Sequence, residues 1–256
     1  IMNGMVRRVA SVIDLVAVRE SRSLKNLHAL GVKNAVLFPD VVFAEDPAEI
    51  SADAFEKWSR EVGLDDKPYF CLSASGLPMS APRNNRQGAV AELVHSLQVL
   101  GLRPVLLARD PDCQFLGEVA RRTGSLYFGP EHDFRELWPL FNKAQFSITG
   151  HFHYIIIGSS VGCPFVPFTN NNHKIRGVCE LLDWYRTEPF DATWLRSCTS
   201  EIVAEARRIL SNRERLSQKL IDRSSELRIE ARALGDRIRE IAGEDTIKRA
   251  AGESAA

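Results

Sequence analysis

The sequence predicts an α/β protein whose main domain is a parallel sheet covered by helices on both faces, followed by a long C-terminal helix. Short apolar runs alternate with segments of helical periodicity between residue 67 and about residue 200, and this alternation is typical of parallel sheets. A β-α-β passage precedes them, and a charged helical stretch follows. The expected segments are therefore residues 1–66, 67–200 and 201–256.

The first segment predicts a strand, a helix and a second strand. An apolar run predicts a buried strand at Leu15–Val18. Ser23 is expected to cap a short helix that Gly31 ends, and Ala35–Phe38 is the second strand. Residues 44–67 are polar and contain proline, which predicts a linker with one short helix.

The second segment predicts five strands that alternate with helices. The expected strands are Tyr69–Leu72, Pro104–Ala108, Ser125–Phe128, Phe146–Thr149 and Pro164–Phe168. The expected helices are Gly88–Leu100, Phe115–Arg122, Phe134–Ala144, one that starts near His153, and Gly177–Trp184. In such sheets ligands bind at the carboxyl ends of the strands.

The third segment predicts a long helix in which one apolar residue recurs every seven positions. These residues are Leu220, Leu227, Leu234 and Ile241. The pattern fits a helix packed on its own protein or a coiled coil. We favour the first, because only one of the two seam positions of a heptad is apolar.

Composition and charge exclude several classes of function. The chain has 33 Lys and Arg and 33 Asp and Glu residues, so it carries no net charge that would attract nucleic acid or an anionic membrane. No apolar run is long enough to predict a transmembrane segment. The five cysteines are odd in number and widely spread, which predicts a reducing, cytoplasmic location and no zinc site.

Two histidines form the centre of the densest polar group at a predicted strand end. His151 and His153 flank one phenylalanine after the strand that ends at Thr149. The start of a helix favours an anion, so a phosphate or carboxylate bound there could share the proton of His153. The alternative is a pair of structural hydrogen-bonding histidines.

Further polar residues follow other predicted strands. Asn171 and Lys174 come after the next strand and are expected at the same edge, although a solvated turn explains them equally well. Arg19 follows the first strand and could bind a carboxylate or phosphate. Ser75 belongs to a loop that could hold a phosphate, although the loop lacks the spacing of a known phosphate-binding motif.

Three stretches resemble polysaccharide pyruvyl transferases, in the same order and over roughly residues 12 to 240. The passage from Val18 to Asp40 resembles the V-R-(D/E)-x-x-S…L…LG…PD passage that joins the two halves of the family. Ser147 to Val166 resembles the S-x-R-L-H…G-x-P-x-V passage. His173 to Gly177 resembles the p-K-x-x-G segment that follows it.

The resemblance implies a two-lobed fold like that of GT-B glycosyltransferases. Residues 1–66 would be the end of the N-terminal lobe and the hinge or linker, 67–200 a Rossmann-like donor-binding lobe, and 201–256 a C-terminal helical tail. The glycine-rich passage that opens the family's N-terminal lobe is missing from this sequence, which begins with Ile1. The expectation is therefore a partial chain or one that has lost its first lobe.

The resemblance also implies an activity, namely a transferase of surface-polysaccharide biosynthesis without a metal or organic cofactor. Such enzymes transfer a pyruvyl ketal from phosphoenolpyruvate to a sugar on a glycan or lipid-linked acceptor. His153 would be the general acid, Arg19 would hold the donor's negative charge, and Lys174 would stabilise the departing phosphate. Asn171 and Ser75 are further expected substrate contacts.

One departure from the family leaves the donor open. His151 stands where the family has an arginine, and a histidine is shorter, not forked and only partly charged at neutral pH. The alternatives are a GT-B glycosyltransferase that uses a nucleotide sugar, and a non-catalytic or partial relative that needs a partner.

Overall fold

The computed structural model describes residues 2–64, 67–74, 83–108, 115–169 and 173–243. The chain forms two compact units. The smaller unit contains the residues up to Glu45 and those from Ser225 onward, and the larger unit is Asp46–Ser224.

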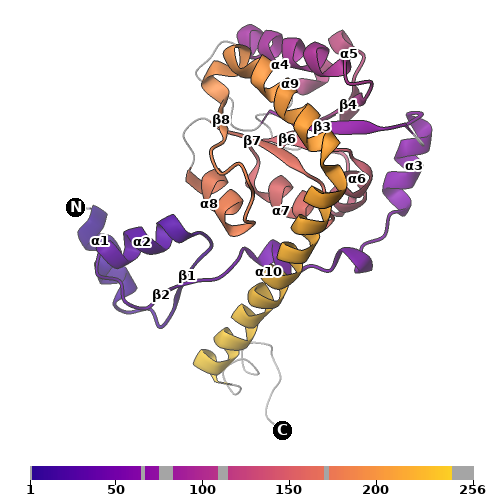
Figure 1. The fold of residues 1–256 in the computed structure, drawn as a ribbon. Coiled ribbons are helices and arrows are strands. Elements are labelled where there is room, and N and C mark those ends of the chain that lie inside the picture. Colours follow the sequence, from indigo (N-terminus) through magenta and orange to yellow (C-terminus); the bar gives the residue numbers. More distant parts are fainter. Residues whose placement is uncertain (1, 65–66, 75–82, 109–114, 170–172, 244–256) are drawn as a thin grey trace. The chain divides into compact units, whose positions relative to one another are not determined.

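The larger unit is built on a six-stranded sheet in which all neighbouring strands are parallel (Figure 1). The strand order is β5-β4-β3-β6-β7-β8. The strands are β3 (Tyr69–Ser73), β4 (Arg103–Leu107), β5 (Leu126–Phe128), β6 (Ser147–Thr149), β7 (Phe165–Thr169) and β8 (Phe190–Asp191). This order confirms the predicted Rossmann-like arrangement, because the chain winds outward from β3 and then restarts beside it at β6.

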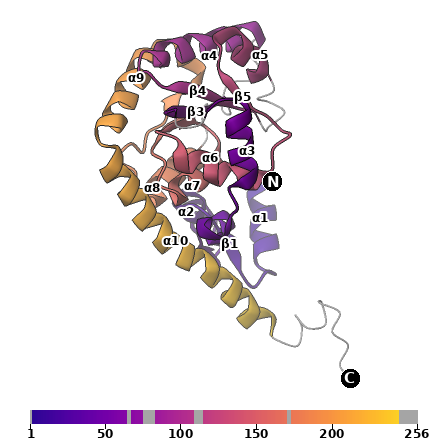
Figure 2. The same ribbon diagram turned by 90° about the vertical axis from the view of Figure 1, so that its right-hand side faces the viewer.

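Two helical layers cover the sheet of the larger unit. In one layer, α4 packs against both α5 and α9, and in the other α7 packs against both α6 and α8 (Figures 1 and 2). The helices are α4 (Arg83–Gln98), α5 (Leu116–Thr123), α6 (Leu137–Lys143), α7 (Phe152–Ser160), α8 (His173–Leu181) and α9 (Leu195–Ser211). α8 begins four residues before the expected helix start at Gly177. Its first residues, such as His173 and Lys174, are polar and fit a solvated loop equally well, so the sequence pattern did not identify them as helical.

Apolar side chains on both sides of the strands explain why the sheet forms at these residues. All five residues of β3 are buried, as expected for a strand that is covered on both faces. Phe70 in β3 stacks on Phe146, which precedes β6, with ring centroids 5.3 Å apart and an interplanar angle of 4°. Neither ring is exposed, so this pair joins the two central strands from within the core.

A long helix, α10 (Arg213–Ala242), follows α9, and its first part packs where several strands begin. We call this side of the sheet the amino edge and the opposite side, where the strands end, the carboxyl edge. The Arg213 side chain donates to the carbonyl oxygen of Ala144 just before β6 (3.2 Å), and Arg223 donates to the carbonyl of Leu181 before β8 (2.9 Å). α10 therefore closes part of the amino edge.

The apolar residues of α10 agree with a helix packed on its own protein. Leu220 and Leu227 are fully buried, Leu234 is half-buried, and Ile241 is exposed. The seven-residue recurrence therefore marks a buried stripe that fades toward the end of the helix.

The smaller unit contains α1 (Met2–Ala10), β1 (Val16–Val18), α2 (Ser21–Ala29) and β2 (Ala35–Leu37). β1 and β2 are parallel, as the β-α-β prediction requires. The cap of α2 differs from the prediction. The Glu20 carboxylate, rather than the Ser23 hydroxyl, accepts the backbone N–H groups of Arg22 and Ser23, both at 2.8 Å. A carboxylate at this position also interacts favourably with the helix dipole.

The compact units cross the segment boundaries expected from the sequence. α3 (Asp53–Glu61) belongs to the larger unit, where Trp58 makes an edge-to-face contact with Phe128 of β5 at 5.0 Å. α9 and the first part of α10 belong to that unit too, while the rest of α10 belongs to the smaller one. Contacts between residues distant in sequence thus determine the division.

Candidate functional site

The strand order identifies one place on the carboxyl edge where a ligand can enter. The order reverses between β3 and β6, so the connections after these two strands leave toward opposite faces of the sheet. In doubly wound sheets this reversal opens a crevice outside the carboxyl ends, where ligands bind. The candidate site therefore begins at the ends of β3 and β6.

Two buried hydroxyl groups meet at this reversal point. Ser73 ends β3 and Thr149 ends β6, and their hydroxyl oxygens lie 3.1 Å apart. Each residue is only 1% exposed. The pairing of Leu72 with Ile148 places the two residues at the next position of the ladder. The hydroxyl pair therefore ties the two central strands together directly beneath the candidate site.

His151 begins the helix that leaves β6. Its backbone N–H donates to the Thr149 hydroxyl at 3.0 Å, and it is the N-cap of α7 with an extended backbone. Its side chain makes no capping hydrogen bond. Instead, its ring stacks on Tyr154, with centroids 4.2 Å apart and an interplanar angle of 16°.

His153 is the second residue of α7, and its ring centroid lies 5.8 Å from that of His151. Both histidines are half-buried, and the Nδ1 atom of the His151 ring is itself buried. The backbone N–H groups of the first turn of a helix favour an anion. The start of α7 thus combines these groups with two imidazoles, which can exchange protons and can carry positive charge.

α8 begins at the same carboxyl edge, after β7. Its first two residues are His173 and Lys174, and both are exposed. Arg176, one turn further, forms an ion pair with Glu188. Lys174 stands in the first turn of α8 at this edge, and Asn171 lies outside the described residues.

Arg86 of α4 is another cation at the carboxyl edge, because α4 follows β3. Its guanidinium carbon lies 5.4 Å from the centre of the Phe115 ring. The loop before α4, with Ser75, lies outside the described residues.

Arg19 lies in the smaller unit, in contrast to the histidines and Lys174. Its Nη1 atom donates to the carboxylate of Asp40 at 2.6 Å. Asp40 is 7% exposed and also accepts the backbone N–H of Val42 at 3.1 Å. The pair joins the residues that follow β1 and β2, so Arg19 has a structural role in its own unit.

Sequence reasoning missed the pairing of the two hydroxyl groups. Thr149 ends a predicted strand and Ser73 directly follows one, which is the available signal. Their pairing follows only when β3 and β6 are known to be neighbours, although the strands are more than seventy residues apart in sequence.

Two thiols in the core of the larger unit are too well protected to act as nucleophiles. Cys71 lies in β3 and Cys163 just before β7, and both are fully buried. Burial raises the pKa of the Cys163 thiol to about 12 and holds the pKa of Cys71 well above its usual range, with a smaller contribution from the neighbouring Cys163. A thiol becomes a strong nucleophile only as the thiolate, so catalysis at this edge depends on other groups.

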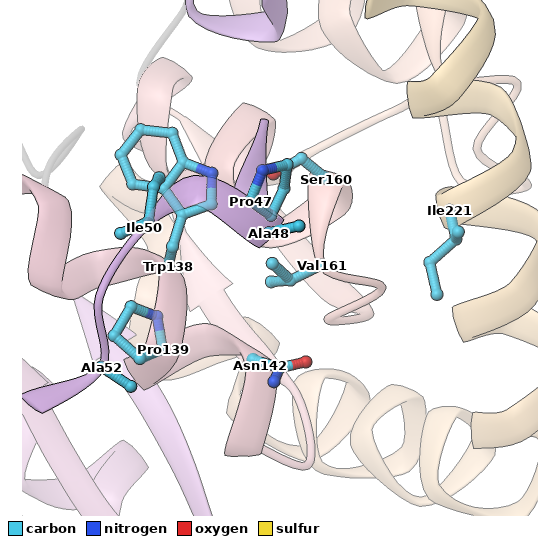
Figure 3. A pocket seen from close by; sticks show the side chains of 10 residues that line it. All are labelled: Pro47, Ala48, Ile50, Ala52, Trp138, Pro139, Asn142, Ser160, Val161 and Ile221. Atoms are coloured by element: carbon cyan, nitrogen blue, oxygen red, sulfur yellow. The ribbon is translucent and has the colours of Figure 1, made fainter. Parts of the chain in front are cut away.

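A cavity of about 350 Å³ lies elsewhere in the larger unit (Figure 3). It is lined by apolar and neutral polar residues, namely Pro47, Ala48, Ile50, Ala52, Trp138, Pro139, Asn142, Ser160, Val161 and Ile221. Ser160 ends α7, so the cavity lies near the amino edge, at the opposite end of α7 from His151. No charged side chain lines it, and it suits an anionic substrate less well than the carboxyl edge does.

Within the described ranges, no three His, Cys, Asp or Glu side chains gather as a metal site would require. None of the described helices combines the length and the apolar character needed to cross a membrane.

Comparisons with known proteins agree with this fold. A family model for polysaccharide pyruvyl transferases matches residues 3–172. Among curated proteins, none matches the sequence.

Solved structures share the architecture at low sequence identity. A glycosyltransferase from Rickettsia africae ESF-5 is 15% identical with a TM-score of 0.59, over 95% of this chain and 68% of that one. The Anabaena protein HepE in complex with UDP is 13% identical with a TM-score of 0.59, over 94% and 68%. The trehalose 6-phosphate synthase of Burkholderia multivorans is 14% identical with a TM-score of 0.57, over 94% and 62%. These likenesses confirm a GT-B-like fold.

Proposed function

Because this chain belongs to the polysaccharide pyruvyl transferase family and is therefore a transferase, we propose that it transfers a pyruvyl group from phosphoenolpyruvate to two hydroxyls of a sugar. The product is a pyruvyl ketal on a surface polysaccharide or its lipid-linked precursor. The reaction takes place in the cytoplasm, as the cysteine pattern predicts.

The proposed reaction joins two sugar oxygens to one carbon of the donor. C3 of phosphoenolpyruvate gains a proton and becomes a methyl group, while C2 forms a bond to each sugar oxygen and loses the bond to phosphate. Of the two protons released by the hydroxyls, one replaces the proton given to C3 and the other leaves with the phosphate. The chemistry thus needs an acid near C3 and positive charge near the phosphate and carboxylate.

The observation that carries the proposal is the pair of half-buried histidines at the start of α7, beside the point where the strand order reverses. His153 is the proposed general acid, since its half-buried ring stands in the first turn of the helix. His151 is proposed to contact the donor carboxylate or phosphate in place of the family's arginine. The N–H groups of this turn favour the same anion.

The other expected contacts have unequal support. Lys174 is exposed at the start of α8 on the same edge, which supports a role in stabilising the departing phosphate. Arg19 forms an ion pair with Asp40, so its proposed role in holding the donor has less support than the role of Lys174. Asn171 and Ser75 keep their proposed substrate roles on sequence grounds alone.

A thermal-shift titration with phosphoenolpyruvate tests the proposal, because a ligand that binds the folded state raises the melting temperature. The wild type, His153→Ala and His95→Ala are compared. His95 is an exposed histidine of α4 and provides a matched control. We expect phosphoenolpyruvate to raise the melting temperature of the wild type and of His95→Ala equally, and that of His153→Ala by less. A response of equal size in all three proteins would remove His153 from the site.

A second candidate donor is a nucleotide sugar. The specific observation in its favour is the fold shared with HepE, which was solved in complex with UDP. The same titration with a panel of nucleotide sugars separates the two donors. If a nucleotide sugar stabilises the protein and phosphoenolpyruvate does not, glycosyl transfer replaces pyruvyl transfer as the proposed function.

A further inference from the structure

The Thr149 hydroxyl lies at the centre of a hydrogen-bond chain that no part of the proposed reaction uses. It accepts the backbone N–H of His151 at 3.0 Å and lies 3.1 Å from the Ser73 hydroxyl. Both hydroxyl-bearing residues are 1% exposed. They are therefore too buried to contact a substrate and can act only through their neighbours.

We propose that Thr149, supported by Ser73, is a positioning residue that holds the two histidines of α7 in their functional geometry. The inference rests on the proposed function for the role of the histidines. The positioning itself rests on the hydrogen bonds and can be measured without catalysis.

The start of α7 needs such support, because the local backbone does not fix it. His151 is the N-cap, yet its side chain makes no capping hydrogen bond. Gly150 precedes it and has no side chain to restrict the backbone. A bond from a threonine side chain to the N–H two residues later is a recognised way to fix a turn. The Thr149 hydroxyl therefore sets the direction in which the chain enters α7.

Ser73 extends this support across the reversal of strand order. A buried hydroxyl needs a partner, and each of the two residues provides one for the other at adjacent ends of β3 and β6. The position of His151 is thus tied to both central strands. Loss of the Thr149 hydroxyl would free the backbone of His151 and leave the Ser73 hydroxyl without this bond.

The test compares three threonine variants. Thr149→Val removes the hydroxyl and keeps the branched shape, and Thr149→Ser keeps the hydroxyl. Thr123→Val is the matched control, because Thr123 is also buried (7% exposed) and its hydroxyl lies 2.6 Å from that of Ser125. Thr123 ends α5, away from the candidate site.

The first measurement is the NMR spectrum of the histidine rings in the ligand-free protein. We expect the signals of His151 and His153 to move in Thr149→Val, to return in Thr149→Ser and to stay unchanged in Thr123→Val. Unchanged signals in Thr149→Val would overturn the positioning role. Ser73→Ala keeps the bond from His151 to Thr149, and it should move the same signals by a smaller amount.

The second measurement is the dissociation constant for phosphoenolpyruvate by calorimetry. We expect Thr149→Val to raise this dissociation constant about tenfold, the upper end of the scale for one hydrogen bond between neutral groups. Thr149→Ser and Thr123→Val should change it less than threefold. A similar rise in Thr123→Val would show a general loss of stability and overturn the inference. If the ring signals move but the wild type binds no phosphoenolpyruvate, the proposed donor is wrong and the positioning role remains.

Discussion

The carboxyl and amino edges of the six-stranded sheet are organised by different interactions. At the carboxyl edge, a buried hydroxyl pair lies beside a helix start that carries two half-buried histidines. At the amino edge, α10 packs apolar residues and donates hydrogen bonds to backbone carbonyls such as those of Ala144 and Leu181. Changes at the first edge should therefore affect ligand binding and catalysis, and changes at the second should affect stability.

His153→Ala should give the largest functional effect. Loss of a general acid slows a reaction by about 100- to 10,000-fold. The melting temperature should change little, because His153 is half-buried at a helix start. The rate is measured as phosphate released from phosphoenolpyruvate with a panel of sugar acceptors. His95→Ala should keep the wild-type rate, and a rate in His153→Ala within tenfold of the wild type would contradict the assignment.

Leu220→Ala should give the largest stability effect at the amino edge. Leu220 is fully buried in α10, and removal of a buried leucine side chain costs about 2 to 5 kcal/mol. Its neighbour Ile221 is 37% exposed, so Ile221→Ala should cost clearly less in a urea titration. Neither variant should change the affinity for phosphoenolpyruvate. A tenfold loss of affinity in the folded Leu220→Ala protein would break the division between the edges.

Gly162→Ala should destabilise the contact between α7 and α10. Gly162 has a positive φ of 74°, and a Cβ atom there would lie 2.9 Å from the Ile221 side chain and would clash with Ser217. Gly124 has a φ of 65° with no atom near its missing Cβ, so Gly124→Ala measures the cost of the backbone conformation alone. That cost is about 1 to 2 kcal/mol, and Gly162→Ala should exceed it in thermal and urea unfolding. Equal losses would show that α10 does not pack tightly there.

Five of the six strands and the position of the candidate edge could be predicted from sequence because they depend on local patterns, whereas the two-residue β8 was not expected. Each expected strand of the larger unit overlaps a strand of the structure, since short apolar runs bounded by polar turns are typical of buried strands. The parallel alternation then places the residues after Thr149 at a ligand-binding edge.

The features that sequence could not provide depend on residues distant in the chain. The contact of Trp58 with Phe128 assigns α3 to the larger unit, and no local pattern predicts it. The bond between Ser73 and Thr149 requires the strand order. The cap of α2 shows a different limit, because Glu20 and Ser23 can both cap a helix and only the backbone geometry selects Glu20.

The smallest predicted effect concerns the response of the amino edge to alkaline pH. Cys163 precedes β7, and burial raises the pKa of its thiol to about 12, above the usual value of about 8.5. Its stabilising contribution is therefore complete below about pH 8.5 and is lost as the pH rises toward 12, because the unfolded chain releases its proton first.

Between pH 8 and 9.5 this loss should amount to about 1 kcal/mol of unfolding free energy for one thiol. Urea titrations of the wild type and Cys163→Ala at both pH values measure it, and the loss should be smaller by this amount in the variant. Cys198 is half-exposed, so Cys198→Ala is the matched control. Its unfolding free energy should fall between the two pH values nearly as much as that of the wild type. If Cys163→Ala and the wild type lose the same unfolding free energy between the two pH values, the thiol is accessible to water and the amino edge is more open than its packing indicates. The stabilising role assigned to the amino edge would then lose this support, and only the predictions for the carboxyl edge would still distinguish the two edges.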